Sequence, residues 1–350
     1  MLHYLFRKLL YALLVLMGVV TLVFWLFQGF GDPERMVVGQ TGDSATLSNI
    51  RKELYLDQSR WKQFVWYCND LSPVSVHQRS EIAKKNLQGF FVGGNSVLAL
   101  KLPYLRTSYQ TKKPVAAVLF DALPGTLLLA LAAMLLATVV GIVLGVLAAV
   151  KKDTWVDTSA VFASILGISA PSFFMGIVIA YFLGFVWSDF TGLPMTGNWY
   201  ETDVETGDRV FRLTNLILPA ITLGIRPLAI ITQLTRSALL DVMQQDYIRT
   251  AYAKGLSSRM VVWKHALRNA LNPVITAVTG WFAELLAGAF FVEYIFGWKG
   301  IGKVTVDALE KLDYPVVMGS VLLTALFFVL VNLLADLLYA WADPRVRADA

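Results

Sequence analysis

The sequence predicts an all-α polytopic membrane protein with six transmembrane helices. Hydrophobic residues make up 56% of the 350 residues and charged residues only 16%, against about 45–50% and about 25% in soluble domains. The mean hydropathy is +0.58. Several apolar runs are long enough to cross a hydrocarbon core roughly 30 Å thick, which takes about 20 helical residues. These runs are continuous, whereas the strands of a membrane barrel would alternate apolar and polar positions.

Six apolar runs supply the predicted spans. Four of them contain no charged residue, and a single charge interrupts each of the other two, Arg226 in the fourth span and Glu284 in the fifth. The first run follows Arg7 and Lys8 as a signal sequence would, but it is too long for a signal core and lacks a small-residue cleavage site, so we expect it to be retained. The runs are residues 9–31, 122–150, 158–188, 213–235, 269–292 and 314–335.

The distribution of positive charge predicts that both termini are cytoplasmic. With the N-terminus inside, the inner segments carry 12 Lys and Arg residues and the two short outer loops carry 5, which is the bias of the positive-inside rule. A large outside loop then follows the first helix. The predicted organisation is an N-terminal tail and first helix (1–31), the large outer loop (32–115), a five-helix core with a cytoplasmic loop at 236–272 (116–342), and a cytoplasmic tail (343–350).

The outer loop holds the whole net charge of the chain, with 12 Lys and Arg against 7 Asp and Glu in a protein of net charge +5. An excess confined to one loop, without a basic helix, does not favour nucleic-acid binding. Cys68 is the sole cysteine and the three histidines are far apart in the sequence. We therefore expect no intramolecular disulfide, metal site or cofactor.

Helical periodicity within this loop covers residues 48–71, with Ser48 as a candidate N-cap. Aromatic residues suit the membrane interface, so we interpret this segment as a helix that lies on the bilayer surface and packs on neighbouring spans. A surface for docking a partner is the alternative. Beyond Pro73 the loop is irregular, and glycines at 89, 93 and 94 interrupt whatever precedes residues 97–102. We assign no element there.

The inner connection at 236–272 has the pattern of a helix, a sharp bend and a second helix. Apolar residues recur near a spacing of 3.6 through its first half. Gly255 can take the left-handed conformation that ends a helix, and Ser257 or Ser258 can cap the next one. Ala251 and Gly255 are small, so another protein could approach the corner closely. A solvated helical hairpin is the alternative interpretation.

Two glycine patterns need separate interpretation. Residues 297–303, Gly-Trp-Lys-Gly-Ile-Gly-Lys, are similar to a phosphate loop, but Val304 stands where Ser or Thr would ligate Mg²⁺. No buried strand precedes this segment and the topology puts it outside, so we predict a bent outer loop. Gly141 and Gly145 form a G-x-x-x-G pattern that can seat a neighbouring helix of this chain or of a partner.

The corner sequence carries a family resemblance. Tyr247-Ile-Arg-Thr-Ala-Tyr-Ala-Lys-Gly255, followed by His265-Ala-Leu-Arg-Asn-Ala270, resembles the EAA loop of binding-protein-dependent ATP-binding-cassette importer permeases, in their dipeptide/oligopeptide branch. Residues 77–109 depart from the family and look like extra sequence. Further family-like pieces occur in the same order along the chain: Gly31-Asp-Pro33, Leu56-Asp57, Gly145–Val150, Asp246-Tyr247, Leu286-Ala-Gly288, Glu293, Asp313-Tyr-Pro315 and Asp343-Pro344-Arg345.

The resemblance implies a multi-pass permease subunit in a bacterial inner membrane, surrounded by lipid. It implies pairing with a second permease subunit and two cytosolic ATPases, which would hydrolyse the ATP, and delivery of peptide by an extracytoplasmic solute-binding protein. The chain itself would not be an enzyme. In that family the bend forms a coupling helix seated in the ATPase. The residues carried over are Arg249, Thr250, Ala251, Lys254, Gly255, Leu256, His265, Arg268 and Asn269.

The alternatives differ in cargo or in class. Nickel or another small solute is the alternative cargo within the family. An ion-coupled secondary transporter is the alternative class, and it would be expected to show an internal repeat and broken helices near the midplane. A membrane-embedded enzyme is not favoured, because no clustered catalytic set is evident.

Arg226 and Glu284 form a predicted intramembrane charged pair. Each lies 11 residues from the estimated end of its span, or about 16 Å deep at 1.5 Å per residue. Ionised side chains at this depth cost several kcal/mol unless they are paired or hydrated. We expect the two to face one another, either as a structural ion pair or as a charged wall of a pathway suited to zwitterionic peptides.

Overall fold

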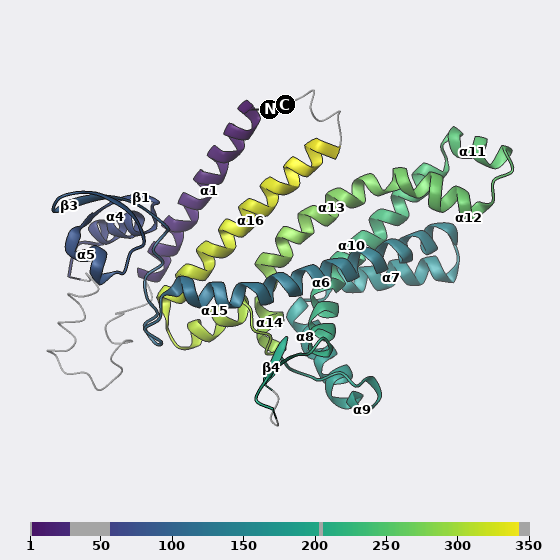
Figure 1. The fold of residues 1–350 in the computed structure, drawn as a ribbon. Coiled ribbons are helices and arrows are strands. Elements are labelled where there is room, and N and C mark those ends of the chain that lie inside the picture. The colour runs from purple at the N-terminus through teal and green to yellow at the C-terminus, as the bar shows by residue number, and fades with distance from the viewer. Residues whose placement is uncertain (1, 29–56, 203–205, 343–350) are drawn as a thin grey trace. The chain divides into compact units, whose positions relative to one another are not determined.

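The computed structural model describes residues 2–28, 57–202 and 206–342, which are mostly helical (Figure 1). Four helices are long and apolar enough to cross a membrane, and a bent pair makes a fifth span if it counts as one. The fifth predicted span, residues 269–292, is not among these candidates in the described part of the chain. The total of six spans and the orientation of the termini stay predictions. The four helices are α1 (Leu2–Gln28), α6 (Val115–Val150), α10 (Thr214–Met243) and α16 (Tyr314–Ala342).

The bent pair corrects the prediction of one continuous third span. Helix α7 (Trp155–Ser169) is followed by α8 (Ser172–Tyr181), and the chain bends by 110° between Trp155–Ser169 and the segment Ser172–Val186. Pro171 has no N–H to continue the helix, and the residue before a proline avoids helical conformation. Ala170 is accordingly extended, with ψ of 130°. A π-helical turn (Phe182–Val186) and α9 (Ser188–Thr191) follow α8.

The inner connection and the C-terminal half are divided into shorter helices. The predicted fifth span falls on two of them, α13 and α14, rather than on one. In chain order they are α11 (Asp246–Ala253), α12 (Ser258–Met260), a π-helical turn (Val261–Ala266), α13 (Leu267–Gly288), α14 (Phe290–Ile295) and α15 (Ile301–Glu310).

The segments that are predicted to lie outside contain strands, so the all-α class is too strict. Strands β1 (Val74–Gln78), β2 (Gly89–Gly93) and β3 (Ser96–Lys101) form an antiparallel sheet in the order β1-β3-β2. A smaller hairpin joins β4 (Tyr200–Thr202) to β5 (Arg209–Phe211). Helices α4 (Arg60–Leu71) and α5 (Arg79–Lys84) accompany the larger sheet. Helix α4 covers residues 60–71 of the predicted 48–71 helix, and residues 57–59 before it are not helical. Residues 48–56 lie outside the described residues.

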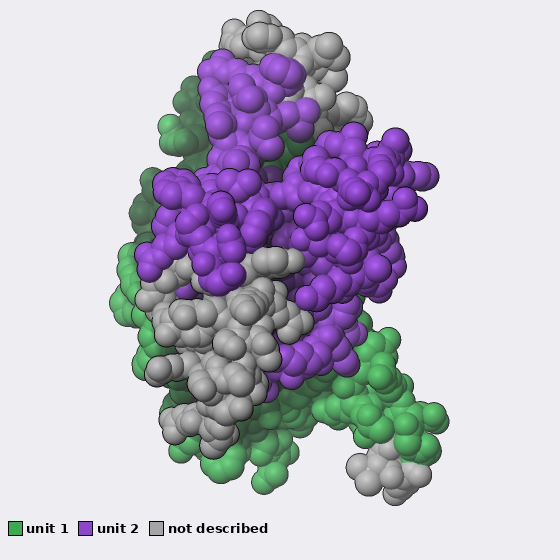
Figure 2. All heavy atoms as spheres, turned by 90° about the vertical axis from the view of Figure 1, so that its left-hand side faces the viewer, with its two compact units in different colours: residues 1, 123–303, 327–350 green, residues 2–122, 304–326 purple. Residues whose placement is uncertain are grey.

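The chain forms two compact units, coloured separately in Figure 2. One unit contains residues 123–303 and 327–350. Here α10 packs against α7, α8 and α13, and Gly141 and Gly145 of α6 fit against it. A Cβ on Gly145 would lie 2.6 Å from Thr235 Cβ, and one on Gly141 would lie 2.9 Å from Ile231 Cγ2. The G-x-x-x-G pattern therefore seats a helix of the same chain.

The other unit contains residues 2–122 and 304–326. Its α4 packs on the end of α1 through aromatic rings, with Phe24 and Phe64 centroids 5.1 Å apart and Trp25 and Trp61 centroids 5.3 Å apart. Asp313, just before α16, accepts hydrogen bonds from the Ser108 hydroxyl and from the Tyr109 N–H at 2.9 Å. This buried carboxylate therefore ties the outer segment to the start of α16.

Candidate coupling corner and charged pocket

The corner between α11 and α12 has the predicted helix, bend and helix. Gly255 has φ of +81°, in the left-handed region. Its N–H donates to the Tyr252 carbonyl at 2.9 Å, and the Leu256 N–H donates to the Ala251 carbonyl at 3.4 Å. These bonds cap the end of α11 in the way a Schellman motif does. Ser257 has extended backbone before the second helix. The predicted bend and glycine-terminated helix are thus confirmed. Ser257 holds the N-cap position, but its side chain makes no capping hydrogen bond.

Ala251 does not leave room for another protein, which corrects the expectation. It is 8% exposed and packs with buried apolar residues of its own chain, including Ile248, Val261 and Val262, while Leu256 covers the cluster in part. The small side chain at 251 therefore lets the two arms of the corner close on each other. This core holds the exposed backbone at Gly255 in a defined place.

The outward side of the corner is basic and aromatic. Of the residues carried over from the family, Arg249, Thr250, Lys254, Gly255, Arg268 and Asn269 are exposed, and His265 is half-buried. The Asn269 side-chain amide donates to the Tyr247 hydroxyl at 2.7 Å, which joins α13 to α11. Four large exposed side chains lie beside them that were not among the predicted coupling residues, although their residue types were visible in the sequence: Tyr247, Tyr252, Met260 and Trp263.

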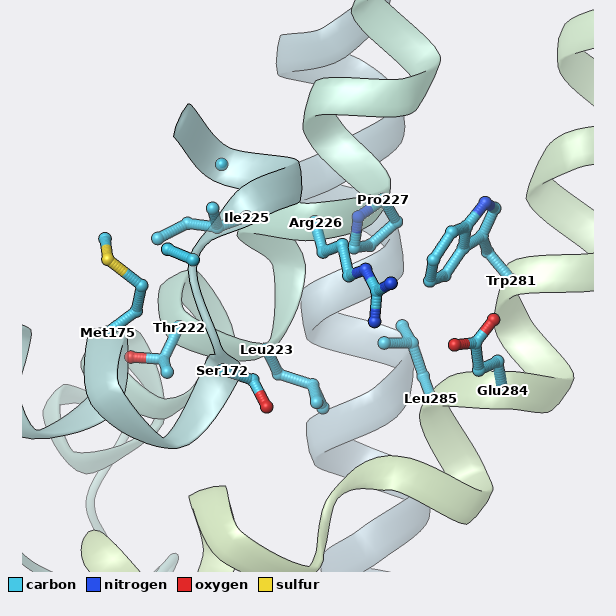
Figure 3. Close-up of a pocket in the computed structure, with 12 residues that line it drawn as sticks. Ser172, Met175, Thr222, Leu223, Ile225, Arg226, Pro227, Trp281, Glu284 and Leu285 are labelled. Atoms are coloured by element: carbon cyan, nitrogen blue, oxygen red, sulfur yellow. The ribbon is translucent and has the colours of Figure 1, made fainter. Parts of the chain in front are cut away.

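A second candidate site lies where the α7–α8 break meets α10 and α13. Figure 3 shows a pocket there with Arg226 projecting from α10 and Glu284 from α13 toward the same hollow. Both residues are exposed in the chain. The Arg226 guanidinium carbon lies 5.6 Å from the centroid of the Trp281 ring, a cation–π arrangement. Among the ion pairs of the described residues, none joins Arg226 to Glu284, so the two side chains line one pocket without the predicted direct ion pair.

The loop that is similar to a phosphate loop binds a carboxylate of its own chain. Glu293 is fully buried. It accepts hydrogen bonds from the Thr126 hydroxyl at 2.7 Å and the Lys303 N–H at 3.1 Å. A Cβ on Gly300 would lie 2.3 Å from Glu293 Cδ, and one on Gly302 would lie 2.4 Å from Phe290 Cα. The glycines therefore allow backbone to approach Glu293 closely.

The outer segment has a buried electrostatic cluster around Asp70. Its carboxylate lies 2.7 Å from Lys85 Nζ and 3.6 Å from Arg106 Nε. Nearby His77 is 2% exposed, and burial, together with Lys85 and Lys101, lowers its pKa. Within the described residues, no group of three or more His, Cys, Asp or Glu side chains could hold a metal ion.

Comparison with known proteins gives the family. Residues 141–348 match the model of the binding-protein-dependent transport system inner membrane component, and residues 1–130 match the model of the N-terminal part of such membrane components. Together the two models cover nearly the whole chain.

Several relatives are similar along most or all of their length. The dipeptide transport system permease protein DppB of Escherichia coli is 36% identical over 99% of both chains. That of Haemophilus influenzae is 44% identical over 69% of this chain and 76% of its own. The glutathione transport system permease protein GsiC of Salmonella choleraesuis is 33% identical over 99% of both chains.

A solved structure has the same fold. An inward-facing MetNI methionine ABC transporter structure covers 65% of this chain and 97% of its own, with a TM-score of 0.50 at 16% identity. The chain therefore belongs to the family of binding-protein-dependent transport system inner membrane components.

Proposed function

We propose that this chain is a permease subunit of an ATP-driven importer and that it forms half of a pathway for peptides. The observation that carries the proposal is the corner at Gly255, which sits in a chain whose full-length relatives are named dipeptide permeases. In this arrangement the chain crosses the inner membrane six times with both termini in the cytoplasm. It pairs with a second permease subunit, and two cytosolic subunits bind and hydrolyse the ATP.

The corner is the contact with the ATPase in this proposal. Its outward side presents backbone at Gly255 together with Arg249 and Lys254, and its inner side is held by an apolar core. A rigid corner transmits displacement, because its two short helices move as one body. Closure of the ATPases would then move α10 and α13, the helices that continue from the corner.

Arg226 and Glu284 lie on those same two helices. We propose that the pocket they line is part of the pathway, and that a solute-binding protein delivers peptide to its outer end. The broken third span is a feature that secondary transporters also have. The relatives in a binding-protein-dependent family favour the ATP-driven class over that alternative.

Purification tests the proposal against that alternative class. The tagged chain, extracted from its native host in mild detergent, is expected to copurify with a second permease and an ATP-binding subunit, identified by mass spectrometry. The purified chain alone, reconstituted in liposomes, is expected to show no dipeptide uptake under proton or sodium gradients. Gradient-driven uptake by the chain alone would contradict the proposal. A purified sample in which mass spectrometry finds no ATP-binding subunit would also contradict it.

A further inference from the structure

The pocket between α10 and α13 holds two opposite charges that the chain leaves unpaired with each other. Arg226 and Glu284 both line it, both are exposed, and no ion pair joins them among the described residues. A structural ion pair would be expected to close the contact and exclude water, because unpaired charges at membrane depth are costly. The arrangement is instead that of two separate charged contacts for a ligand.

The groups around the two charges divide the pocket by sign. On one side Ser172 begins α8, so the positive end of that helix adds to the field of the Arg226 guanidinium. A guanidinium presents a fork of donors that matches a carboxylate. On the other side Glu284 is an acceptor suited to an ammonium group. The pocket thus complements a molecule with a carboxylate at one end and an ammonium at the other.

The rest of the pocket lining offers few polar groups to a ligand. Trp281 lies beside Arg226, and the apolar side chains of Leu223 and Leu285 line the same pocket (Figure 3). Apolar walls accept side chains of different shapes with modest discrimination. A pocket that fixes two charges and tolerates what lies between them suits a class of ligands rather than a single compound. Peptide main-chain termini are such a pair, since both are ionised near pH 7.

We infer that this pocket binds short peptides by their free ends, with the terminal carboxylate at Arg226 and the terminal ammonium at Glu284. The inference rests on the proposed function, because it names how the imported peptide is held within the permease. It predicts a ligand preference that belongs to the membrane subunit and is separate from that of the solute-binding protein.

The test uses the complete importer in lipid nanodiscs without its solute-binding protein and without nucleotide. Tritiated dialanine is bound, and unlabelled dialanine, N-acetyl-dialanine and dialanine amide compete. In the parent protein, dialanine is expected to compete at least about tenfold better than either blocked peptide, the factor that loss of a charge-assisted hydrogen bond supports. This comparison changes only the ligand and needs no variant to fold.

Variants then assign each end. In Arg226→Met the amide should compete as well as dialanine while the N-acetyl peptide stays weak, and Glu284→Gln should give the reverse pattern. Arg226→Lys, which keeps the charge, should retain part of the preference and serves if the methionine variant does not assemble. Arg209→Met on β5 and Asp189→Asn on α9 are matched exposed controls outside the pocket, and they should leave all three affinities unchanged.

Three results would overturn the inference: no saturable binding in the parent, equal competition by blocked and free peptides, or variants that weaken all three ligands by one common factor. The proposed function is judged separately by ATP-driven uptake with the solute-binding protein present. An importer that takes up dialanine but fails the competition pattern retains the proposed function and loses this inference.

Discussion

Arg236 of α10 and Asp157 of α7 form a two-point ion pair, with Nε 2.5 Å from Oδ1 and Nη2 2.7 Å from Oδ2. The carboxylate side chain is 6% exposed and the arginine side chain 25%. Asp157 also accepts the Asp153 N–H at 3.1 Å, within the turn that precedes α7. The pair therefore links the start of the broken third span to the part of α10 that leads into the corner.

Breaking this pair should destabilise the protein. In Arg236→Met the buried Asp157 carboxylate loses its charged partner, which costs on the order of 3 kcal/mol. In Asp157→Asn the partly exposed Arg236 loses its partner, so the cost should be smaller. We expect a lower melting temperature in detergent for each single variant and partial recovery in the exchanged variant Asp157→Arg with Arg236→Asp. A matched change of the exposed and weakly paired Arg249, to Met, should leave the melting temperature unchanged. An unchanged melting temperature in both single variants would show that the pair does not stabilise the protein.

Gly255→Pro should uncouple ATP hydrolysis from transport while the spans stay inserted. Proline requires φ near −65°, and Gly255 has φ of +81°, so the corner cannot keep its shape. Ser257→Pro is the matched control, because Ser257 already has φ of −64°. The measurement is the ratio of peptide taken up to ATP hydrolysed by the complete importer. Full coupling in Gly255→Pro would remove the corner from the mechanism.

A bulky side chain at 251 should have the same effect by another route. Ala251→Leu overfills the apolar core of the corner, and overpacking of this kind costs about 1–3 kcal/mol. Ala253 lies on the same helix and is exposed, so Ala253→Leu should preserve the corner core. Circular dichroism and expression level check insertion, and the uptake to hydrolysis ratio checks coupling. Equal ratios in both variants would count against a role for the buried core.

Two glycines in neighbouring segments should respond to alanine in opposite directions. A Cβ on Gly302 would meet Phe290 Cα at 2.4 Å, whereas a Cβ on Gly280 meets nothing within 4 Å. We expect Gly302→Ala to destabilise by about 1–3 kcal/mol and Gly280→Ala, within helix α13, to be neutral or stabilising by about 0.5–1 kcal/mol. Thermal unfolding of the two purified variants decides. A Gly302→Ala protein as stable as the parent would show that the backbone at Gly302 and Phe290 can move apart to accept a methyl group.

The outer segment should lose stability on acidification because of His77. Its pKa is lowered in the folded state, so between the folded and unfolded pKa values the unfolded chain binds more protons and stability rises with pH. The stabilisation is complete above the ordinary histidine pKa of 6.5 and is lost as the pH falls below that value. Its size is about 1.4 kcal/mol for each tenfold difference in proton affinity between the folded and unfolded states. Charges facing His77 are Asp70, Glu81, Lys85 and Lys101.

Hydrogen exchange of strand β3, corrected for the intrinsic effect of pH, measures this stability. Protection should fall between pH 7.5 and pH 5.5 in the parent and should fall less in His77→Phe, which keeps an aromatic ring but cannot be protonated. If the two proteins lose protection equally, another group controls the acid response.

The sequence predicted the features whose signals are local. Apolar runs identify α6 and α16. The end of α11 at Gly255 was predicted because helical periodicity and a glycine that can take the left-handed conformation are visible within a few neighbouring residues. Pro171 was equally visible, but the apolar run around it favoured one span. The proline that breaks the helix was visible in the sequence, but the prediction gave more weight to the hydropathy of the run.

Other features depend on contacts that one sequence does not display. In β3 both Val97, which is buried, and Leu98, which is exposed, are apolar, so the alternation that predicts a strand is absent. The site of Glu293 depends on Thr126, 167 residues earlier in the chain. The depth estimate predicted that Arg226 and Glu284 face one another, but the pocket that they line also depends on the break between α7 and α8, which required the structure.

The most direct test of the account is ATP-driven uptake of tritiated dialanine into proteoliposomes that contain this chain with its copurified permease and ATP-binding subunits, and with the solute-binding protein on the outside. We predict accumulation inside the vesicles that requires internal ATP and the solute-binding protein, and that Gly255→Pro abolishes while ATP hydrolysis continues. Accumulation without ATP, or none in the fully assembled complex, would contradict the account.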